Sequence, residues 1–162
     1  MSDSTLLLNS IMATHLIIYD GICNLCVNFV KALEQIDRGK TFSYLPMQDL
    51  EGLSKWQITA ADCELGMILI DLQSPATNRW QGSNAAEQIA KLLPLGNLAV
   101  SFYQFLPGLK PLGDRTYIQV RDNRYQLFGK REQLYNSLYS EVCDTNCKQF
   151  SPLPQKSSVV GD

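Results

Sequence analysis

The stretch that decides the fold is Leu16-Ile17-Ile18-Tyr19-Asp20-Gly21-Ile22-Cys23-Asn24-Leu25-Cys26. Its apolar start predicts a buried strand, Asp20-Gly21 predicts a tight turn, and the residues from Cys23 onward predict an amphipathic helix. Cys23 therefore lies at a helix N-terminus, where unpaired backbone N–H groups and the helix dipole favour a thiolate over a thiol. Cys26 follows one turn later on the same face, so the two sulfurs can close a disulfide. We expect a dithiol that cycles between reduced and oxidised forms.

Beyond this motif, strand and helix patterns alternate along the chain. The expected order is strand, helix, strand, short helix, strand, strand and helix, over residues 16–19, 23–38, 41–45, 48–64, 66–72, 79–82 and 84–93. Strand–helix–strand predicts a parallel pair, and the later hairpin adds an antiparallel edge. Ser83-Asn84 with Glu87 resembles a helix-capping box. The pattern indicates an α/β fold with a thioredoxin-like mixed four-stranded sheet and flanking helices.

The chain of 162 residues is long enough to bury a core as one domain. We expect that domain over residues 15–149, after a disordered leader over 1–14. From about residue 97 we expect an added C-terminal helical segment, with helices at 97–106 and 114–128. The tail over 150–162 contains prolines and serines and is expected to be disordered.

Composition limits the partners and the compartment. A net charge of -2 gives no reason to expect nucleic acid or an anionic membrane as a partner. No apolar run approaches the ~20 residues that span a bilayer. The first residues lack the basic segment and the long apolar segment of a secretion signal. We therefore expect a cytoplasmic protein.

The cysteines are the residues with the most chemistry. There are five, an odd number, at Cys23, Cys26, Cys63, Cys143 and Cys147. In a reducing compartment such residues are more often catalytic, redox-sensing or metal-binding than structural. Cys143 and Cys147 could supply the second half of a zinc site or act as an accessory redox pair. Cys63 is most simply a small buried hydrophobe.

Within the motif we assign roles to three side chains. Cys23 is expected to be the attacking thiolate, and Cys26, expected to be the more buried of the two, the resolving thiol. Asp20 would mainly accept backbone N–H bonds in its turn. Its second possible role is proton exchange with Cys26.

Residues of the predicted 114–128 helix could complete this site. A carboxylate beside Cys23 opposes thiolate formation, so a nearby cation would help. Arg121 and Arg124 are candidates, although the default expectation for both is a solvated helix surface. Tyr117 and Tyr125 on the same helix are expected to pack rather than to catalyse.

Three motifs in order resemble the DCC family of thiol-disulfide oxidoreductases, named for D-x-x-C-x-x-C. They are Asp20-Gly21-Ile22-Cys23-Asn24-Leu25-Cys26, Gly82-Ser83-Asn84-Ala85, and Tyr117 with Asn123-Arg124-Tyr125-Gln126-Leu127-Phe128-Gly129. The resemblance covers about residues 15–130. It implies a thioredoxin-like fold with Cys23 and Cys26 as the redox pair. One departure is Leu65-Gly66-Met67, where thioredoxin relatives place a cis-proline before a strand.

The expected function is dithiol–disulfide exchange of the protein-disulfide reductase type, without an organic cofactor or a metal. The partners would be a client protein or a small-molecule disulfide, and an electron donor of the thioredoxin or glutathione type. The alternative is a non-catalytic binding module whose cysteines hold a structural zinc or are merely buried.

Overall fold

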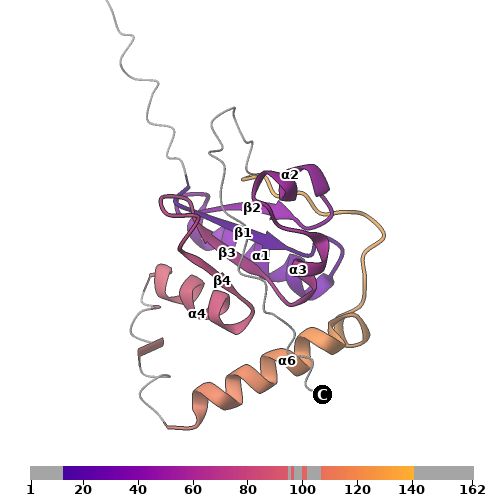
Figure 1. Cartoon of the computed structure of the whole chain (residues 1–162). Helices are drawn as coiled ribbons and strands as arrows, with labels where there is room; N and C mark the ends of the chain where they lie inside the picture. Colours follow the sequence, from indigo (N-terminus) through magenta and orange to yellow (C-terminus); the bar gives the residue numbers. More distant parts are fainter. Residues whose placement is uncertain (1–12, 95, 97–99, 102–106, 141–162) are drawn as a thin grey trace, which may run out of the picture.

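A computed structural model describes residues 13–94, 96, 100–101 and 107–140 of the chain. Its centre is a mixed four-stranded sheet with the spatial order β2-β1-β3-β4 (Figure 1). The strands are β1 (His15–Tyr19), β2 (Phe42–Pro46), β3 (Ile68–Asp71) and β4 (Arg79–Gln81). β1 is parallel to β2 and antiparallel to β3, and β3 pairs with β4 as an antiparallel hairpin. The predicted fold class and strand directions are confirmed.

The helices form layers on both faces of the sheet. They are α1 (Asn24–Asp37), α2 (Leu50–Lys55), α3 (Ala60–Glu64), α4 (Ser83–Leu92) and α6 (Leu109–Phe128). Successive residues of a strand point to opposite faces, and β1 follows this rule. Ile17 and Tyr19 pack in one apolar cluster with residues of α1 and α4. Leu16 and Ile18 pack in the other cluster with residues of α2 and α3.

A buried carboxylate orients α1 against the sheet. Asp37, the last residue of α1, is only 8% exposed. Its Oδ2 accepts the backbone N–H groups of Thr41 and Phe42 at 2.9 and 3.0 Å. These bonds satisfy donors at the start of β2, which otherwise would be costly to bury. The helix that begins at the cysteine motif is therefore attached at its far end to the neighbouring parallel strand.

Some element boundaries differ from expectation. The segment 48–64 forms two short helices, α2 and α3, rather than one. The predicted capping box at Ser83-Asn84 is wrong, because α4 has Gly82 as its N-cap and no side-chain cap bond. Glu87 instead pairs with Lys110 of α6. α6 begins five residues before the predicted start at 114, and Pro111 is accommodated in its first turn, where a backbone N–H has no helical partner.

Several expectations fall largely outside the described residues. They are most of the leader, the helix over 97–106 and the tail over 150–162, together with Cys143 and Cys147. Thr14, at the end of the expected leader, donates its backbone N–H to the carbonyl oxygen of Thr41. In the described part of the chain, no helix combines the length and apolar character needed to cross a membrane.

The long helix α6 lies outside the two layers (Figure 1, orange), and it contacts both α1 and α4. It has no fully buried residue. Its attachment therefore depends on half-buried side chains and polar contacts rather than on an apolar face. Two of those contacts, from Arg124 and Tyr125, reach Asp20 of the D-x-x-C-x-x-C motif.

Candidate active site

Cys23 caps the N-terminus of α1. Its backbone is extended (φ -85°, ψ 120°), and its Sγ accepts the backbone N–H of Cys26 at 3.4 Å. In this position the sulfur faces unpaired N–H groups and the positive end of the helix dipole. The predicted placement of Cys23 at a helix N-terminus is confirmed. Cysteines in such positions have lowered pKa values.

The two thiols differ in acidity in the order expected for an attacking and a resolving cysteine. A hydrogen bond from the Cys26 side chain lowers the pKa of Cys23 to about 6, against the opposing effect of burial. The backbone N–H of Cys26 lowers the pKa of Cys23 further, and the Asp20 charge raises it. The same side-chain bond, together with burial, raises the pKa of Cys26 well above its usual range. Near neutral pH the pair therefore holds one thiolate, on Cys23, and one thiol.

The expected order of burial is wrong. Cys23 has no exposed surface, whereas Cys26 retains some. Cys23 is covered by residues 129–131, the covering segment, which follow α6 and pair with the motif in an antiparallel bridge at Lys130. The backbone N–H of Asn24 donates to the Gly129 carbonyl oxygen at 3.3 Å, and the backbone N–H of Arg131 donates to the Ile22 carbonyl oxygen at 2.7 Å. The chain after the helix thus shields the predicted nucleophile.

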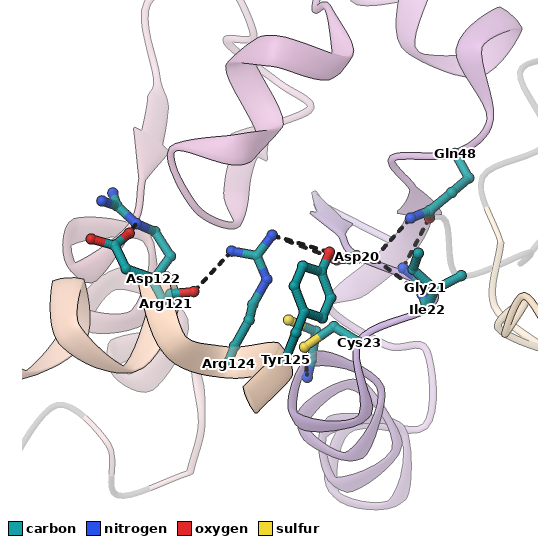
Figure 2. A network of polar contacts seen from close by, with 10 residues as sticks. Asp20, Gly21, Ile22, Cys23, Gln48, Arg121, Asp122, Arg124 and Tyr125 are labelled. Atoms are coloured by element: carbon teal, nitrogen blue, oxygen red, sulfur yellow. Dashed lines mark hydrogen bonds and ion pairs between the residues drawn. The ribbon is translucent and has the colours of Figure 1, made fainter. Parts of the chain in front are cut away.

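Asp20 is the centre of a polar network that joins β1 to α6 (Figure 2). It is 5% exposed. Its Oδ1 accepts from the Ile22 N–H at 3.1 Å and from Gln48 Nε2 at 2.8 Å. Its Oδ2 accepts from Arg124 Nη2 at 3.4 Å and from the Tyr125 hydroxyl. A carboxylate has about four acceptor sites, so this one is fully occupied.

The structure places more side chains of α6 at this site than the sequence predicted. Arg124 was expected on a solvated surface, but its side chain is 13% exposed and forms an ion pair with Asp20. Tyr125 was expected only to pack, and its hydroxyl donates to the same carboxylate. The Arg124 guanidinium and the Lys130 ammonium lie 4.7 and 4.2 Å from the Tyr125 ring centre. Gln48 was not predicted as a partner of Asp20. The sequence gave only the general indication that a buried carboxylate needs several hydrogen-bond donors.

α6 also covers the loop that precedes β3. Arg121 Nη1 donates to the Leu65 carbonyl oxygen at 3.0 Å. Gly66 has φ +122°, and a Cβ there would lie 2.8 Å from the Tyr117 hydroxyl and 3.0 Å from the Gly82 Cα. Glycine is therefore required for Tyr117 to approach this loop. The place of the absent proline is thus occupied by a glycine that α6 packs against.

The remaining cysteines do not join the pair in the part of the chain that is described. Cys63 is 6% exposed in the α2–α3 cluster, as expected of a small buried hydrophobe. Burial raises the pKa of the Cys63 thiol to about 12. Among the described residues, no group of three or more His, Cys, Asp or Glu side chains could hold a metal ion. The zinc alternative needs Cys143 and Cys147, which lie outside that part, and stays a prediction.

The mixed sheet and the cysteine pair at the start of α1 define a protein with a thioredoxin-like α/β fold and a C-x-x-C dithiol. Residues 17–130 match the family model of the DCC1-like thiol-disulfide oxidoreductases. The chain belongs to this family, as the three sequence motifs indicated. No curated protein and no solved structure is significantly similar to it.

The acidity of Cys23 predicts a specific pH profile. Its alkylation rate by iodoacetamide is expected to rise with a midpoint near pH 6, because only the thiolate reacts and its pKa is about 6. Cys63 in the same sample is expected to stay unmodified at neutral pH, since its pKa is about 12. Residue-resolved mass spectrometry measures both rates. A Cys23 midpoint near the ordinary value of ~8.5 would contradict an activated thiolate.

The same acidity predicts how the stability of the reduced protein depends on pH. The Cys23 pKa is lowered in the folded state, so between about pH 6 and ~8.5 the Cys23 sulfur binds more protons in the unfolded chain than in the folded one. The contribution of Cys23 to stability therefore rises with pH across this window and is lost as the pH falls towards 6. Urea unfolding of the reduced protein at several pH values tests this. Cys23→Ser is the control and should remove the rise.

The covering segment is expected to limit the access of reagents to Cys23. Asn24 Nδ2 donates to the Phe128 carbonyl oxygen at 2.9 Å, and Asn24 Oδ1 accepts from Arg131 Nε at 3.0 Å. Asn24→Ala removes both bonds, each worth roughly 0.5–1.5 kcal/mol. Opening of the segment becomes easier, and alkylation of Cys23 should accelerate by about tenfold. The matched control is Asn28→Ala, an exposed position one turn further along α1. Equal rates in both variants would show that the segment does not limit access.

Proposed function

We propose that this protein is a thiol-disulfide oxidoreductase of the protein-disulfide reductase type, acting through Cys23 and Cys26. The observation that carries the proposal is the acidity of Cys23 at the N-terminus of α1, beside a protonated Cys26. A thiolate and a thiol one turn apart are what an exchange reaction needs. Membership of the DCC1-like family supports the same chemistry.

The reaction proceeds in two exchanges. The Cys23 thiolate attacks one sulfur of the substrate disulfide, a protein–substrate disulfide forms, and the other substrate sulfur leaves as a thiolate. Cys26 then loses its proton to solvent or to the departing thiolate and attacks Cys23. The Cys23–Cys26 disulfide forms, and the second substrate sulfur leaves. One disulfide is reduced to two thiols as the pair is oxidised, and an external dithiol or glutathione-type donor restores the pair.

Asp20 acts in this proposal as a positioning residue. All four of its acceptor sites are occupied by donors from Ile22, Gln48, Arg124 and Tyr125. To take a proton from Cys26 it would have to lose one of these partners, at a cost of about 1 kcal/mol or more. Its charge also raises the pKa of both cysteines, although other groups contribute more. The carboxylate mainly fixes α6 against the dithiol.

Attack by Cys23 requires access to a covered sulfur. The covering segment hides Cys23 completely, while Cys26 keeps some exposed surface. We therefore place opening of residues 129–131 before the first exchange with a large substrate. α6 has no fully buried residue, which makes such a movement energetically accessible. The substrate is a client protein or a small disulfide, and the setting we propose is the reducing cytoplasm.

A redox titration of the pair tests the function. The protein is equilibrated with mixtures of reduced and oxidised dithiothreitol, its free thiols are alkylated, and the fraction of oxidised Cys23–Cys26 is measured by mass spectrometry. We expect a single two-electron transition, which Cys26→Ser abolishes. The function would be refuted by an absent transition. Zinc analysis of anaerobically purified protein identifies the alternative, for which about one zinc per chain, lost in Cys23→Ser, is expected.

A further inference from the structure

Arg124 of α6 and the resolving Cys26 line the same cavity, which has a volume of about 210 Å³. The Arg124 side chain is only 13% exposed. Its Nη2 donates to Asp20 Oδ2 at 3.4 Å and to the Tyr125 hydroxyl at 3.3 Å (Figure 2). Its Nη1 donates to the Arg121 carbonyl oxygen at 3.1 Å. These bonds hold a positive charge at a fixed place in the wall of the cavity.

The other titratable groups in the described wall of this cavity leave little charge to balance. Asp20 supplies one carboxylate, and Arg121 supplies a second guanidinium. Arg121 Nε forms an ion pair at 2.8 Å with Asp122, a carboxylate outside the lining. Burial raises the pKa of the remaining titratable side chains, which are therefore neutral near pH 7: Tyr19, Cys63 and Tyr117.

The covering segment brings two further cations to the motif, but neither lines the cavity. Lys130 Nζ lies 4.2 Å from the Tyr125 ring centre, and Arg131 bonds to the start of α1. Burial raises the pKa of Tyr125, so its hydroxyl is neutral. Within the described wall, the charge balance beside the resolving thiol therefore depends on the pair formed by Asp20 and Arg124.

Attachment of a substrate to Cys23 changes the charge beside Cys26. In the resting protein the Cys23 thiolate and the Asp20 carboxylate are negative, and Arg124 offsets one of these two charges. A disulfide at Cys23 is uncharged, and it removes the hydrogen bond between the two sulfurs, which is the largest cause of the raised Cys26 pKa. Burial and the Asp20 charge still raise that pKa, and the Arg124 charge lowers it. Without Arg124, the Cys26 thiolate would form beside an unpaired buried carboxylate, which opposes its formation.

We propose that Arg124 is a positioning residue of the second exchange, because its guanidinium offsets the Asp20 carboxylate and so allows the Cys26 thiolate to form and attack Cys23. The inference rests on the proposed function and adds a residue to its second step. In that step the Cys26 proton leaves to solvent or to the departing thiolate, and the Cys23–Cys26 bond forms. The bond between Cys23 and the substrate breaks, and the substrate sulfur keeps the electron pair. Arg124 transfers no proton, since a guanidinium stays charged in proteins.

Thiolate formation at Cys26 can be measured without any exchange. Cys23→Ser removes the neighbouring thiolate, as substrate attachment does, and leaves Cys26 free to react. In this background the alkylation rate of Cys26 by iodoacetamide is measured against pH by residue-resolved mass spectrometry. Adding Arg124→Gln should raise the midpoint by about one pH unit, which is a rate about tenfold lower below the midpoint. Arg124→Lys keeps the charge and should move the midpoint by less than half as much.

A merely structural role of Arg124 would give the opposite sign. If Arg124→Gln only loosened α6, Cys26 would become more exposed, and exposure lowers the pKa of a buried thiol. The matched control is Arg115→Gln, the same change at an exposed position of α6 outside the cavity lining, and it should leave the midpoint unchanged. An unchanged or lower midpoint in Arg124→Gln, or an equal rise in both variants, refutes the proposal.

A second comparison keeps the test decisive if Arg124→Gln does not fold. Asp20→Asn removes the carboxylate that Arg124 offsets, and the double variant Asp20→Asn with Arg124→Gln leaves neither charge unpaired. Both are made in the Cys23→Ser background. The Cys26 midpoint should be about one unit higher in the double variant than in Asp20→Asn alone, because the same positive charge is lost. Equal midpoints in these two variants refute the proposal.

The second exchange itself connects this charge to turnover. Reduced protein is mixed with glutathione disulfide at pH 7 and quenched with acid, and mass spectrometry follows the glutathione adduct at Cys23 as it converts to the Cys23–Cys26 disulfide. Arg124→Gln should slow this conversion by about tenfold, and Arg124→Lys should largely restore it. A conversion rate unaffected by Arg124→Gln refutes the role in the second exchange. If no adduct forms in the wild type, the proposed function fails, while the Cys26 midpoints still decide the effect of Arg124.

Discussion

Cys26→Ser is expected to leave the protein covalently attached to its disulfide substrate through Cys23. The first exchange still proceeds, but no second sulfur is present to release the substrate. Cys23→Ser is expected to abolish exchange altogether. A thiol with a pKa of about 6 is about 90% ionised at pH 7, whereas an ordinary thiol near ~8.5 is about 3% ionised. Cys26 cannot replace Cys23 as the attacking thiolate, because the pKa of Cys26 is raised rather than lowered.

The trapping result is read by mass spectrometry after incubation with a model disulfide. The adduct should map to Cys23, and Cys63 in the same molecules serves as the internal control because it is buried and stays protonated. Asn24→Ala combined with Cys26→Ser should accelerate trapping of large substrates if residues 129–131 limit access. An adduct that forms equally at Cys63, or no adduct at all, would contradict the assigned roles.

Asp20→Ala is expected to reduce the free energy of unfolding by about 3–5 kcal/mol. It removes one member of a buried ion pair and leaves the Arg124 charge without its carboxylate. It also deprives Gln48 Nε2 and the Tyr125 hydroxyl of their acceptor. Urea denaturation of the reduced protein measures the loss. The matched control is Asp122→Ala, which breaks an ion pair of α6 whose carboxylate is 56% exposed and should cost less than about 1 kcal/mol.

Asp20→Asn separates positioning from proton transfer. The amide keeps the size of the side chain but removes the charge that raises the pKa of both cysteines. The midpoint of Cys23 alkylation should therefore move to lower pH, and the Cys23 rate should increase because α6 is held less firmly. A carboxylate needed as the base for Cys26 would instead give a large fall in the rate of the second exchange.

Local pattern was sufficient for much of the fold. The apolar run ending at Tyr19 predicted β1, and the residues from Cys23 onward predicted α1, because strand burial and helix periodicity are read from neighbouring residues. The strand–helix–strand order implied the parallel pair and the later hairpin the antiparallel edge. Boundaries were less reliable: α4 has no side-chain cap, and α6 starts before its predicted first residue. There, contacts with distant elements outweigh local signals, as in the Glu87–Lys110 pair.

The site was predictable in its chemistry but not in its surroundings. Cys23 and Cys26 could be assigned because a helix N-terminus alters the pKa of a nearby thiol through local backbone groups. The partners of Asp20 could not be assigned, since Arg124 and Tyr125 are more than a hundred residues away along the chain. The relative burial of the two cysteines was wrong for the same reason, because the covering segment follows α6.

The sequence by itself thus determined a strand–turn–helix with a dithiol at the helix start and the succession of strands and helices after it, because these depend on periodicity and on local backbone geometry. Only the tertiary structure decided that α6 folds back over the motif. That packing gives Asp20 two of its four donors, covers Cys23, and leaves an apolar cavity beside Cys26. Such features arise from contacts between side chains that are far apart in the sequence, and local sequence patterns do not predict those contacts.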